Sequence, residues 1–164
     1  MTMHLISDSA AISPLCNLET SVRGSKLVIG DHCMIDAFVK IKFAGGSGDV
    51  RLGQHVYINS GSVIYSGNGV RMDDNVLIAA NCTFAPVNHA YIDRNRRIRE
   101  QGFLPSKGGI LIEEDVWIGA NCVILDGTHI GRGAVVGANS LVIGKLEAYG
   151  VYAGNPLQLK GSRS

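Results

Sequence analysis

A six-residue repeat is the feature that most restricts how this chain can fold. From Ile112 the sequence runs IEEDVW, IGANCV, ILDGTH, IGRGAV and VGANSL, so five consecutive hexads begin with Ile or Val. The same register recurs upstream in sets of three. All eighteen first positions are apolar: Ile6, Ile12, Leu18, Ile29, Ile35, Ile41, Leu52, Ile58, Ile64, Met72, Ile78, Phe84, Ile112, Ile118, Ile124, Ile130, Val136 and Val142. A period of six is neither helical nor a simple alternation.

This period predicts a short strand followed by a corner, repeated along the chain. Three hexads would close one triangular coil, and six stacked coils would form an all-β parallel β-helix. The first and fifth positions should point inward, with small residues or Val at the fifth. Asn81, Asn121 and Asn139 share the fourth position, which fits stacked corners that need a positive φ. The length predicts a single domain over residues 1–164.

The composition agrees with a narrow interior and excludes several classes of function. The chain has 21 glycines and only 6% aromatic residues, yet 46% of it is hydrophobic. The net charge of +1 argues against nucleic acid as the main partner, because binding to phosphates needs a surplus of Lys and Arg. No apolar run is long enough to cross a membrane, and no secretion signal is evident. We therefore expect a cytoplasmic protein.

The cysteines and two of the histidines have structural interpretations. Cys16, Cys33, Cys82 and Cys122 all occupy fifth positions, as does Val22, and are expected to fill the core. A reactive or metal-binding role is the lesser alternative. His32 and His55 occupy the fourth position in successive coils, so they should stack about 5 Å apart on the surface. A solvated ladder is favoured there over a metal pair.

Breaks in the register are where function is expected. Short extensions follow Ile41 and Ile64 and are interpreted as loops without chemistry. A third break runs from Ala85 to Leu111, 27 residues, and includes four of the nine arginines, at positions 94, 96, 97 and 99. Loops of this length are often functional. This one is either a solvated basic loop or a surface for an anionic ligand.

His89 ends the hexad that begins at Phe84, where the chain leaves the solenoid. The coil should fix its backbone on one side, and the long loop can cover it on the other. Imidazole titrates near neutral pH and can take a proton from a hydroxyl or an amine. His89 is therefore a candidate general base, although a histidine at the start of a loop is by itself a weak signal.

Longer segments resemble the hexapeptide-repeat acyltransferases, which fold as left-handed β-helices. The segments are NVLIAANCTF, NHAYIDRNRRIREQG, GGILIEEDVWIGANCVILDGTHIGRGAVVGANSLVIGK and VYAGNP, within Leu52 to Pro156. The similarity is greatest to the galactoside, maltose and polysaccharide O-acetyltransferase branch. The left hand of the helix is implied by this resemblance alone, because parallel crossovers are ordinarily right-handed.

The resemblance implies acetyl-CoA as co-substrate, a small-molecule sugar acceptor, no metal and no covalent enzyme intermediate. His89 matches the family's catalytic histidine, and Asn59 matches an acceptor-binding asparagine. Trp117 matches an aromatic residue that lines the CoA groove. Ala120 and Ala138 match positions whose backbone amides contact the acyl donor, and the Ala120 amide is the candidate for stabilising the oxyanion. The resemblance also implies a homotrimer with active sites shared between subunits.

Three departures from the family pattern leave the acceptor and part of the donor site open. The paired aspartates of the galactoside branch are replaced by Ser66 and Gly67. The branch's N-terminal helical region has no counterpart here. The Thr-Lys pair that commonly follows the last hexads reads Ile143-Gly144, with Lys145 one place later. Lys145, Lys160 and Arg163 are therefore all candidates for contacts with the CoA phosphates.

Four functions remain on the sequence. The favoured one is O-acetylation of a sugar, in surface polysaccharide synthesis. The second is N-acetylation of a nucleotide-linked amino sugar from the same donor. The third is a carbonic-anhydrase-like metalloenzyme, which needs three histidines around one zinc, whereas His32 and His55 lie in a different column from His89. The fourth is an assembly protein without chemistry.

Overall fold

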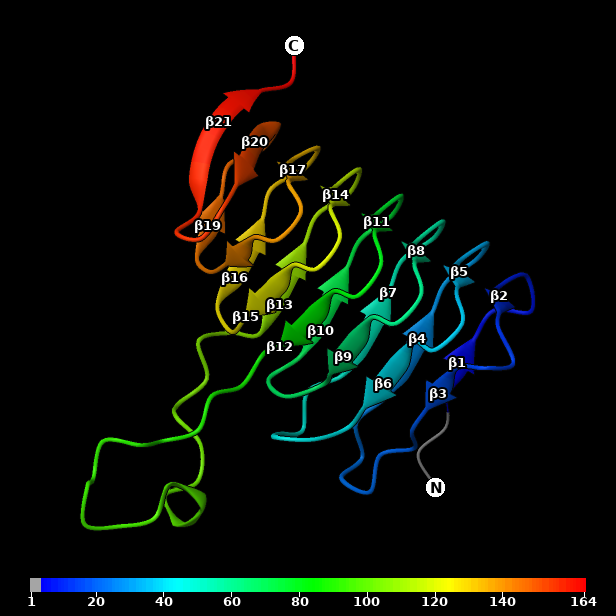
Figure 1. The fold of residues 1–164 in the computed structure, drawn as a ribbon. Coiled ribbons are helices and arrows are strands. Elements are labelled where there is room, and N and C mark those ends of the chain that lie inside the picture. Colours follow the sequence, from blue (N-terminus) through cyan, green and yellow to red (C-terminus); the bar gives the residue numbers. More distant parts are fainter. Residues whose placement is uncertain (1–3) are drawn as a thin grey trace.

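The structure is a computed structural model that describes residues 4–164, so residues 1–3 of the expected domain lie outside the described part. The chain winds into a stack of triangular coils with three flat sides, each side a sheet (Figure 1). The first sheet contains β1 (Leu5–Ile6), β4 (Leu27–Ile29), β7 (Val50–Leu52), β10 (Val70–Met72), β13 (Ile110–Ile112), β16 (Thr128–Ile130) and β19 (Lys145–Leu146).

The other two sheets follow in the same order along the chain. The second sheet contains β2 (Ala11–Ile12), β5 (Met34–Ile35), β8 (Tyr57–Ile58), β11 (Leu77–Ile78), β14 (Trp117–Ile118), β17 (Val135–Val136), β20 (Gly150–Ala153) and β21 (Gln158–Ser162). The third sheet contains β3 (Asn17–Leu18), β6 (Lys40–Lys42), β9 (Val63–Tyr65), β12 (Thr83–Ala85), β15 (Val123–Leu125) and β18 (Leu141–Val142).

The strand register confirms the hexads and the six coils. In the first sheet Leu52 pairs with Ile29 on one side and with Met72 on the other, so first positions stack directly. All strand pairs between successive coils are parallel, whereas β21 folds back antiparallel on β20. Strands β19 and β20 add a partial seventh coil. We number the coils from the N-terminus by their strand in the first sheet.

The core is a column of aliphatic side chains inside the coils. The first positions of coils two to six are all buried, whereas Ile6, Ile12 and Leu18 in the first coil are partly exposed at the open end of the stack. Cys33, Cys82 and Cys122 are fully buried, which confirms their role as core fillers.

Each of these three thiols donates to a carbonyl oxygen of the following coil, at 3.0–3.2 Å. Burial raises the pKa of the Cys33 thiol. The neighbouring Cys122 thiol, together with burial, raises the pKa of Cys82, whereas the pKa of Cys122 is lowered by its contact with Cys82. Cys16 lies in the first coil and is half-buried, and burial raises its pKa as well.

Val22 is a wrong prediction of the repeat. Its side chain is 95% exposed, because the chain also leaves the register after Leu18, over residues 19–26. The inward position that precedes the next first position is filled by Leu27 instead, which is fully buried. The stack requires an inward-pointing residue two places before each first position. After an insertion, that residue is counted back from the next first position and not forward from the preceding hexad.

The corners are as expected. Asn81, Asn121 and Asn139 all have φ between 58° and 59°. His32 and His55 also have positive φ, and their rings stack with centroids 5.0 Å apart and planes 24° from parallel. Within residues 4–164 no group of three or more His, Cys, Asp or Glu side chains is placed to hold a metal ion. Nor does that part of the chain contain a helix long and apolar enough to span a membrane.

The long loop is slightly shorter than the sequence suggested. Ala85 belongs to β12, and Ile110 and Leu111 belong to β13, because the residues flanking a first position complete its strand. The loop therefore covers residues 86–109 and contains one 3-10 turn, η1 (Ile98–Glu100). It leaves the stack at the edge between the third and first sheets and projects well away from it (Figure 1).

Candidate active site

His89 lies in the narrow neck of the loop. It forms an isolated antiparallel bridge with Phe103. The amide of Ala90 donates to the carbonyl of Gly102 at 3.0 Å, and the amide of Leu104 donates to that of Asn88 at 2.8 Å. The rings of His89 and Phe103 face one another with centroids 4.7 Å apart. The neck thus presents an exposed imidazole backed by an aromatic ring.

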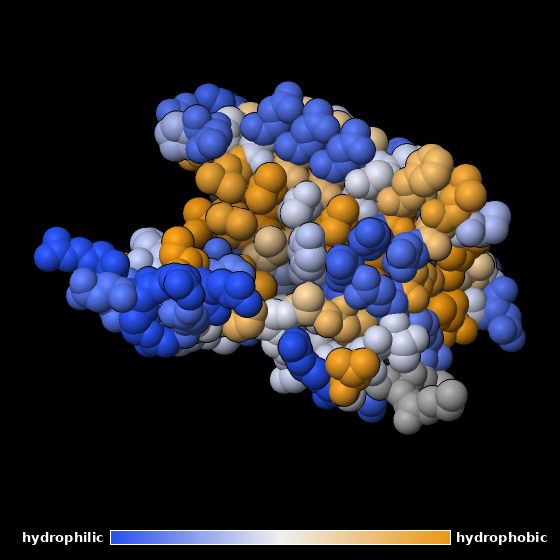
Figure 2. Space-filling view, turned by 60° about the horizontal axis from the view of Figure 1, so that its bottom comes forward, coloured by the Kyte–Doolittle hydropathy of each residue, from blue (hydrophilic) through white to orange (hydrophobic). Residues whose placement is uncertain are grey.

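The tip of the loop is exposed throughout residues 91–100. Its conformation is held by its own contacts: the Gln101 side-chain amide donates to the carbonyls of Asp93 and Arg96, and Arg97 pairs with Glu100 at 3.2 Å. Figure 2 shows the loop as a hydrophilic projection, with a hollow of largely hydrophobic wall between it and the stack.

Trp117 stands on the outer face of the second sheet and is 51% exposed. Its neighbours in register are Leu77 and Val135. These residues and Arg163 line a shallow groove of about 280 Å³. An exposed indole on a flat apolar face offers a stacking surface for a planar ligand such as a nucleobase.

Ala120 follows β14 and Ala138 follows β17, so both lie at the edge between the second and third sheets. The Asn139 amide donates to the Ala120 carbonyl at 2.9 Å, so the corners of coils five and six are joined. The amides of Ala120 and Ala138 donate no hydrogen bond within residues 4–164. Two backbone donors are thus left available at this edge, which is what a carbonyl or oxyanion requires.

Asn59 occupies the same edge two coils earlier, about 10 Å along the stack from the Ala120 corner. Its side-chain oxygen accepts the Ser60 amide at 2.8 Å, and its side-chain NH₂ donates to no residue in the described chain. Asn59, Ala120 and Ala138 therefore lie along one edge of the prism, and Trp117 lies on the adjoining face of the second sheet. The sequence motifs that contain them are far apart, and the coils bring them into line.

His89 does not join this group within one chain. Its loop leaves the prism between the third and first sheets, whereas Trp117 and Ala120 lie around the edge between the second and third. The groove beside Trp117 is lined without it. Within one chain, His89 is therefore separate from the Trp117 groove.

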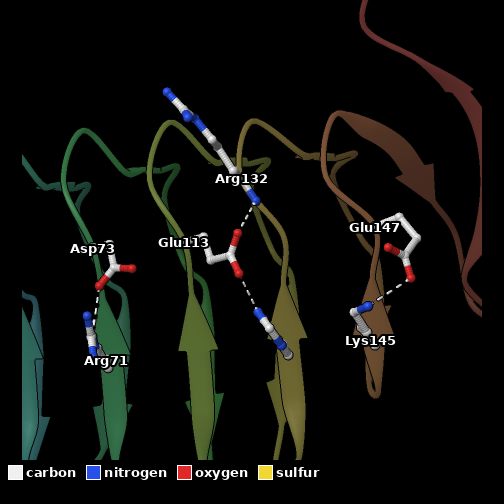
Figure 3. Close-up of polar contacts among 7 residues, drawn as sticks. Arg71, Asp73, Glu113, Arg132, Lys145 and Glu147 are labelled. Carbon is white, nitrogen blue, oxygen red and sulfur yellow. Dashed lines mark hydrogen bonds and ion pairs between the residues drawn. The ribbon is translucent and has the colours of Figure 1, made fainter.

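The three candidate basic residues lie in different places. Lys145 is on the first sheet, where it pairs with Glu147 at 3.2 Å among other ion pairs of that face (Figure 3). Lys160 lies on β21 and contacts Gln158 at 2.8 Å. Arg163 alone of the three lines the Trp117 groove, held by Asp115 at 3.0 Å and by the Gly133 carbonyl at 2.9 Å.

Ser66 and Gly67, which replace the aspartates of the galactoside branch, are both buried. The Ser66 hydroxyl has no hydrogen-bond partner in the part of the chain described. Gly67 packs under the long loop, where an added Cβ would come within 2.8 Å of the Pro86 carbonyl oxygen. The sequence analysis assigned no role to Phe103, because nothing in the sequence distinguishes it from the other apolar residues of the loop, such as Tyr91 and Ile98.

Comparisons with known proteins bear on the fold and the family of this chain. Residues 109–144 match the model of the bacterial transferase hexapeptide (six repeats). Galactoside O-acetyltransferase of Escherichia coli is 30% identical over 141 residues, 86% of this chain and 66% of that protein. A hexapeptide-repeat acetyltransferase of Vibrio cholerae, solved with acetyl coenzyme A, has a TM-score of 0.66 and 27% identity over 98% of this chain and 71% of that one.

A further solved structure shares the fold. An N-acyltransferase from Bacillus cereus, in complex with dTDP-4-amino-4,6-dideoxyglucose and coenzyme A, has a TM-score of 0.81 and 23% identity, covering 97% of this chain and 83% of that one. The chain shares the hexapeptide repeat of these bacterial transferases over residues 109–144, and its solenoid is the left-handed parallel β-helix. It spans 29–66% of the length of four curated relatives that it matches.

Proposed function

We propose that this protein transfers an acetyl group from acetyl-CoA to a hydroxyl group of a sugar or polysaccharide precursor. The proposal rests on two neighbouring features of the second sheet. The Trp117 side chain is exposed on its outer face, and the backbone amides of Ala120 and Ala138 at its edge donate no hydrogen bond within residues 4–164. The indole suits the planar base of the donor, and the amides suit its thioester oxygen. Relatives named as galactoside and lipopolysaccharide O-acetyltransferases support the choice of a hydroxyl acceptor.

In the proposed mechanism the His89 imidazole takes the proton of the acceptor hydroxyl. The acceptor oxygen attacks the thioester carbonyl carbon directly. The Ala120 amide donates to the oxygen that becomes negative in the tetrahedral intermediate. The carbon–sulfur bond then breaks, the coenzyme leaves as its thiol with the proton returned from His89, and the ester product is released. Arg163 is the basic residue best placed for a phosphate of a donor bound along Trp117. Lys145 and Lys160 would contact a donor that extends beyond this groove.

We further propose a homotrimer in which each site is shared. The support is geometric: His89 and the Trp117 groove lie at different edges of one prism, and a three-fold arrangement would bring unlike edges together. Mixing subunits tests this directly. His89→Ala and Trp117→Ala proteins should each be weakly active, and co-refolding them should restore activity because some interfaces receive both intact residues. A stable monomer that retains acetyl transfer would refute the shared site.

The alternative is N-acetylation of a nucleotide-linked amino sugar. One observation favours it: the His89 side chain has a ring contact with Phe103 but no hydrogen bond within residues 4–164 that would orient it as a base. A free amine attacks a thioester with less help from a base than a hydroxyl needs. The two proposals therefore differ in how strongly they depend on His89.

A screen of hydroxyl and amine acceptors, followed by release of the free coenzyme thiol, tests both. With a hydroxyl acceptor, His89→Ala should lower kcat by roughly 10²- to 10⁴-fold. KM for acetyl-CoA should change little, because the imidazole acts on the transition state more than on donor binding. His55→Ala is the matched control, since it also removes an exposed histidine. Activity of the His89→Ala protein within about threefold of wild type would exclude the general base and favour the amine acceptor.

We also propose that the enzyme works in the cytoplasm, where acetyl-CoA is available, and that residues 1–164 act as one domain. Cell fractionation with an antibody against the protein tests the first point. Recovery in a secreted fraction would contradict it.

A further inference from the structure

Asp126 is a buried carboxylate to which the proposed reaction gives no role. It lies at the corner between β15 and β16, and the residue is only 2% exposed. A buried carboxylate is costly unless its oxygens accept hydrogen bonds. Within residues 4–164 it forms no ion pair, so neutral donors must compensate its burial.

Its three donors all belong to segments at the edge where the long loop leaves. The amide of Lys107 donates to Oδ2 at 2.9 Å, and the amide of Gly109 donates to Oδ1 at 2.9 Å. The side-chain amide of Asn68 donates to Oδ2 at 3.1 Å. Hydrogen bonds to an ionised acceptor are stronger than neutral ones. Asp126 therefore holds residues 103–109, which we call the returning strand of the loop, at the corner between β15 and β16.

The other end of the loop is fastened to the same edge. The amide of Asn68 donates to the Pro86 carbonyl at 3.0 Å. The methyl groups of Val87 lie against Gly45, where an added Cβ would come within 2.6 Å of them. The two short insertions after Ile41 and Ile64 thus serve as supports for the loop, which the sequence did not predict.

Between these fastened ends stands the neck. From Lys107 the chain is only four residues from Phe103, which bridges to His89 and faces its ring at 4.7 Å. The position of the imidazole therefore depends on where the returning strand is held. Within the described residues the His89 side chain has no hydrogen bond, ion pair or further ring contact that would fix it.

We propose that Asp126 is a positioning residue that places His89 for proton transfer, acting through the returning strand and Phe103. This inference rests on the proposed function of His89. A positioning role differs from a general stabilising role, because loss of the Asp126 carboxylate should displace the His89 imidazole in particular. A shift of about 1 Å in a catalytic group can lower a rate by about 10²-fold.

The first test needs no variant and no acceptor. Hydrogen exchange of the wild-type protein should show the Lys107 and Gly109 amides protected at least about 100-fold relative to the exposed amides of residues 91–100, because a buried acceptor holds them. Exchange of both at the rate of the loop tip would overturn the anchor.

The second test follows the His89 ring by NMR, with the signal assigned by its loss in His89→Ala. The nearby Phe103 ring should displace the imidazole proton resonances in the wild type. In Asp126→Asn the displacement should be lost, because an Asn NH₂ group must face at least one of the three donors. Phe103→Leu, a change at a half-exposed loop residue, should also abolish it and keeps the test available if Asp126→Asn does not fold. Ile35→Val, in the second coil, is the control for a loss of stability alone.

The third test is kinetic. Asp126→Asn and Phe103→Leu should lower kcat about 10- to 100-fold, with KM for acetyl-CoA within about twofold, and neither should lower the residual rate of the His89→Ala protein further. An unchanged His89 resonance in folded Asp126→Asn, or an additive loss in the His89→Ala background, would overturn the proposal. If no acceptor supports transfer while exchange and NMR behave as expected, the proposed function fails and the anchor stands.

Discussion

Replacing Gly119 by Ala should damage the donor site through one methyl group. Gly119 follows Ile118 at the edge that carries Ala120, and its backbone lies against the next coil. An added Cβ would come within 2.6 Å of the Ala138 nitrogen and 3.0 Å of its Cα. Ordinary contacts at such a place are 3.4–4 Å. Because the obstructing atoms are backbone, coils five and six must separate locally by nearly an ångström.

The magnitude follows from the cost of overpacking. Forcing such a group into a filled space costs about 1–3 kcal/mol. For a chain of this length each kcal/mol lowers Tm by roughly 2–4 °C, so we expect a drop of roughly 2–12 °C. The displaced amide of Ala138 should also weaken acetyl-CoA binding. Trp117 is the only tryptophan of the chain, so its fluorescence can report the binding directly.

Two other glycines provide matched controls. Gly30→Ala creates the same kind of clash, 2.3 Å from the Gly53 oxygen, but in the second coil. It should lower Tm at least as much and leave acetyl-CoA binding unchanged. Gly161→Ala meets no atom within 4 Å and should change neither. A Gly119→Ala protein with wild-type Tm and wild-type affinity would refute both the packing argument and the location of the donor site.

Three further predictions concern other parts of the molecule. Trp117→Ala should weaken acetyl-CoA binding with little loss of stability, since the indole is half exposed, and calorimetry of binding and unfolding checks both. The hydrogen bond from His129 at 2.7 Å, together with the Arg132 amide, lowers the pKa of Glu113 from 4.5. Its stabilisation should therefore be complete above about pH 4.5 and disappear as pH falls through the lowered value, so Glu113→Gln should unfold more easily than wild type at neutral pH but not at the lowest pH that the fold survives. The buried thiols of Cys33 and Cys82 should resist iodoacetamide in the native protein and react only on unfolding, because both are shielded from solvent and have a raised pKa, and mass spectrometry of the labelled protein checks this.

Much of the fold could be predicted because the repeat is local. The six residues of each hexad are enough to predict which side chain points inward. The strand register then follows, because the first positions of successive coils stack on one another. The prediction failed at Val22, where an insertion moved the inward position to Leu27. Counting from the preceding hexad could not reveal this, because the position is set by the neighbouring coil.

The candidate site was only partly within reach of the sequence. The motifs named the residues, but not which of them meet. Lys145 and Arg163 looked equivalent as cations near the end of the chain, yet they lie on different sheets, and only Arg163 lines the Trp117 groove. The two cations lie on different sheets because the chain turns a corner of the prism every few residues, and each corner moves the following side chains to the next face.

The triangular coil, its narrow aliphatic core, the corners at positive φ and the place where a loop interrupts the stack could all be predicted from the residues alone. These depend on side-chain volume and backbone freedom at positions six residues apart. The tertiary structure decided how the loop is held. Asn68, Lys107 and Gly109 converge on buried Asp126 from three separate segments, and no periodic pattern relates them. Hydrogen bonds between residues distant in sequence depend on where the coils place their atoms, and that is known only once the chain has folded.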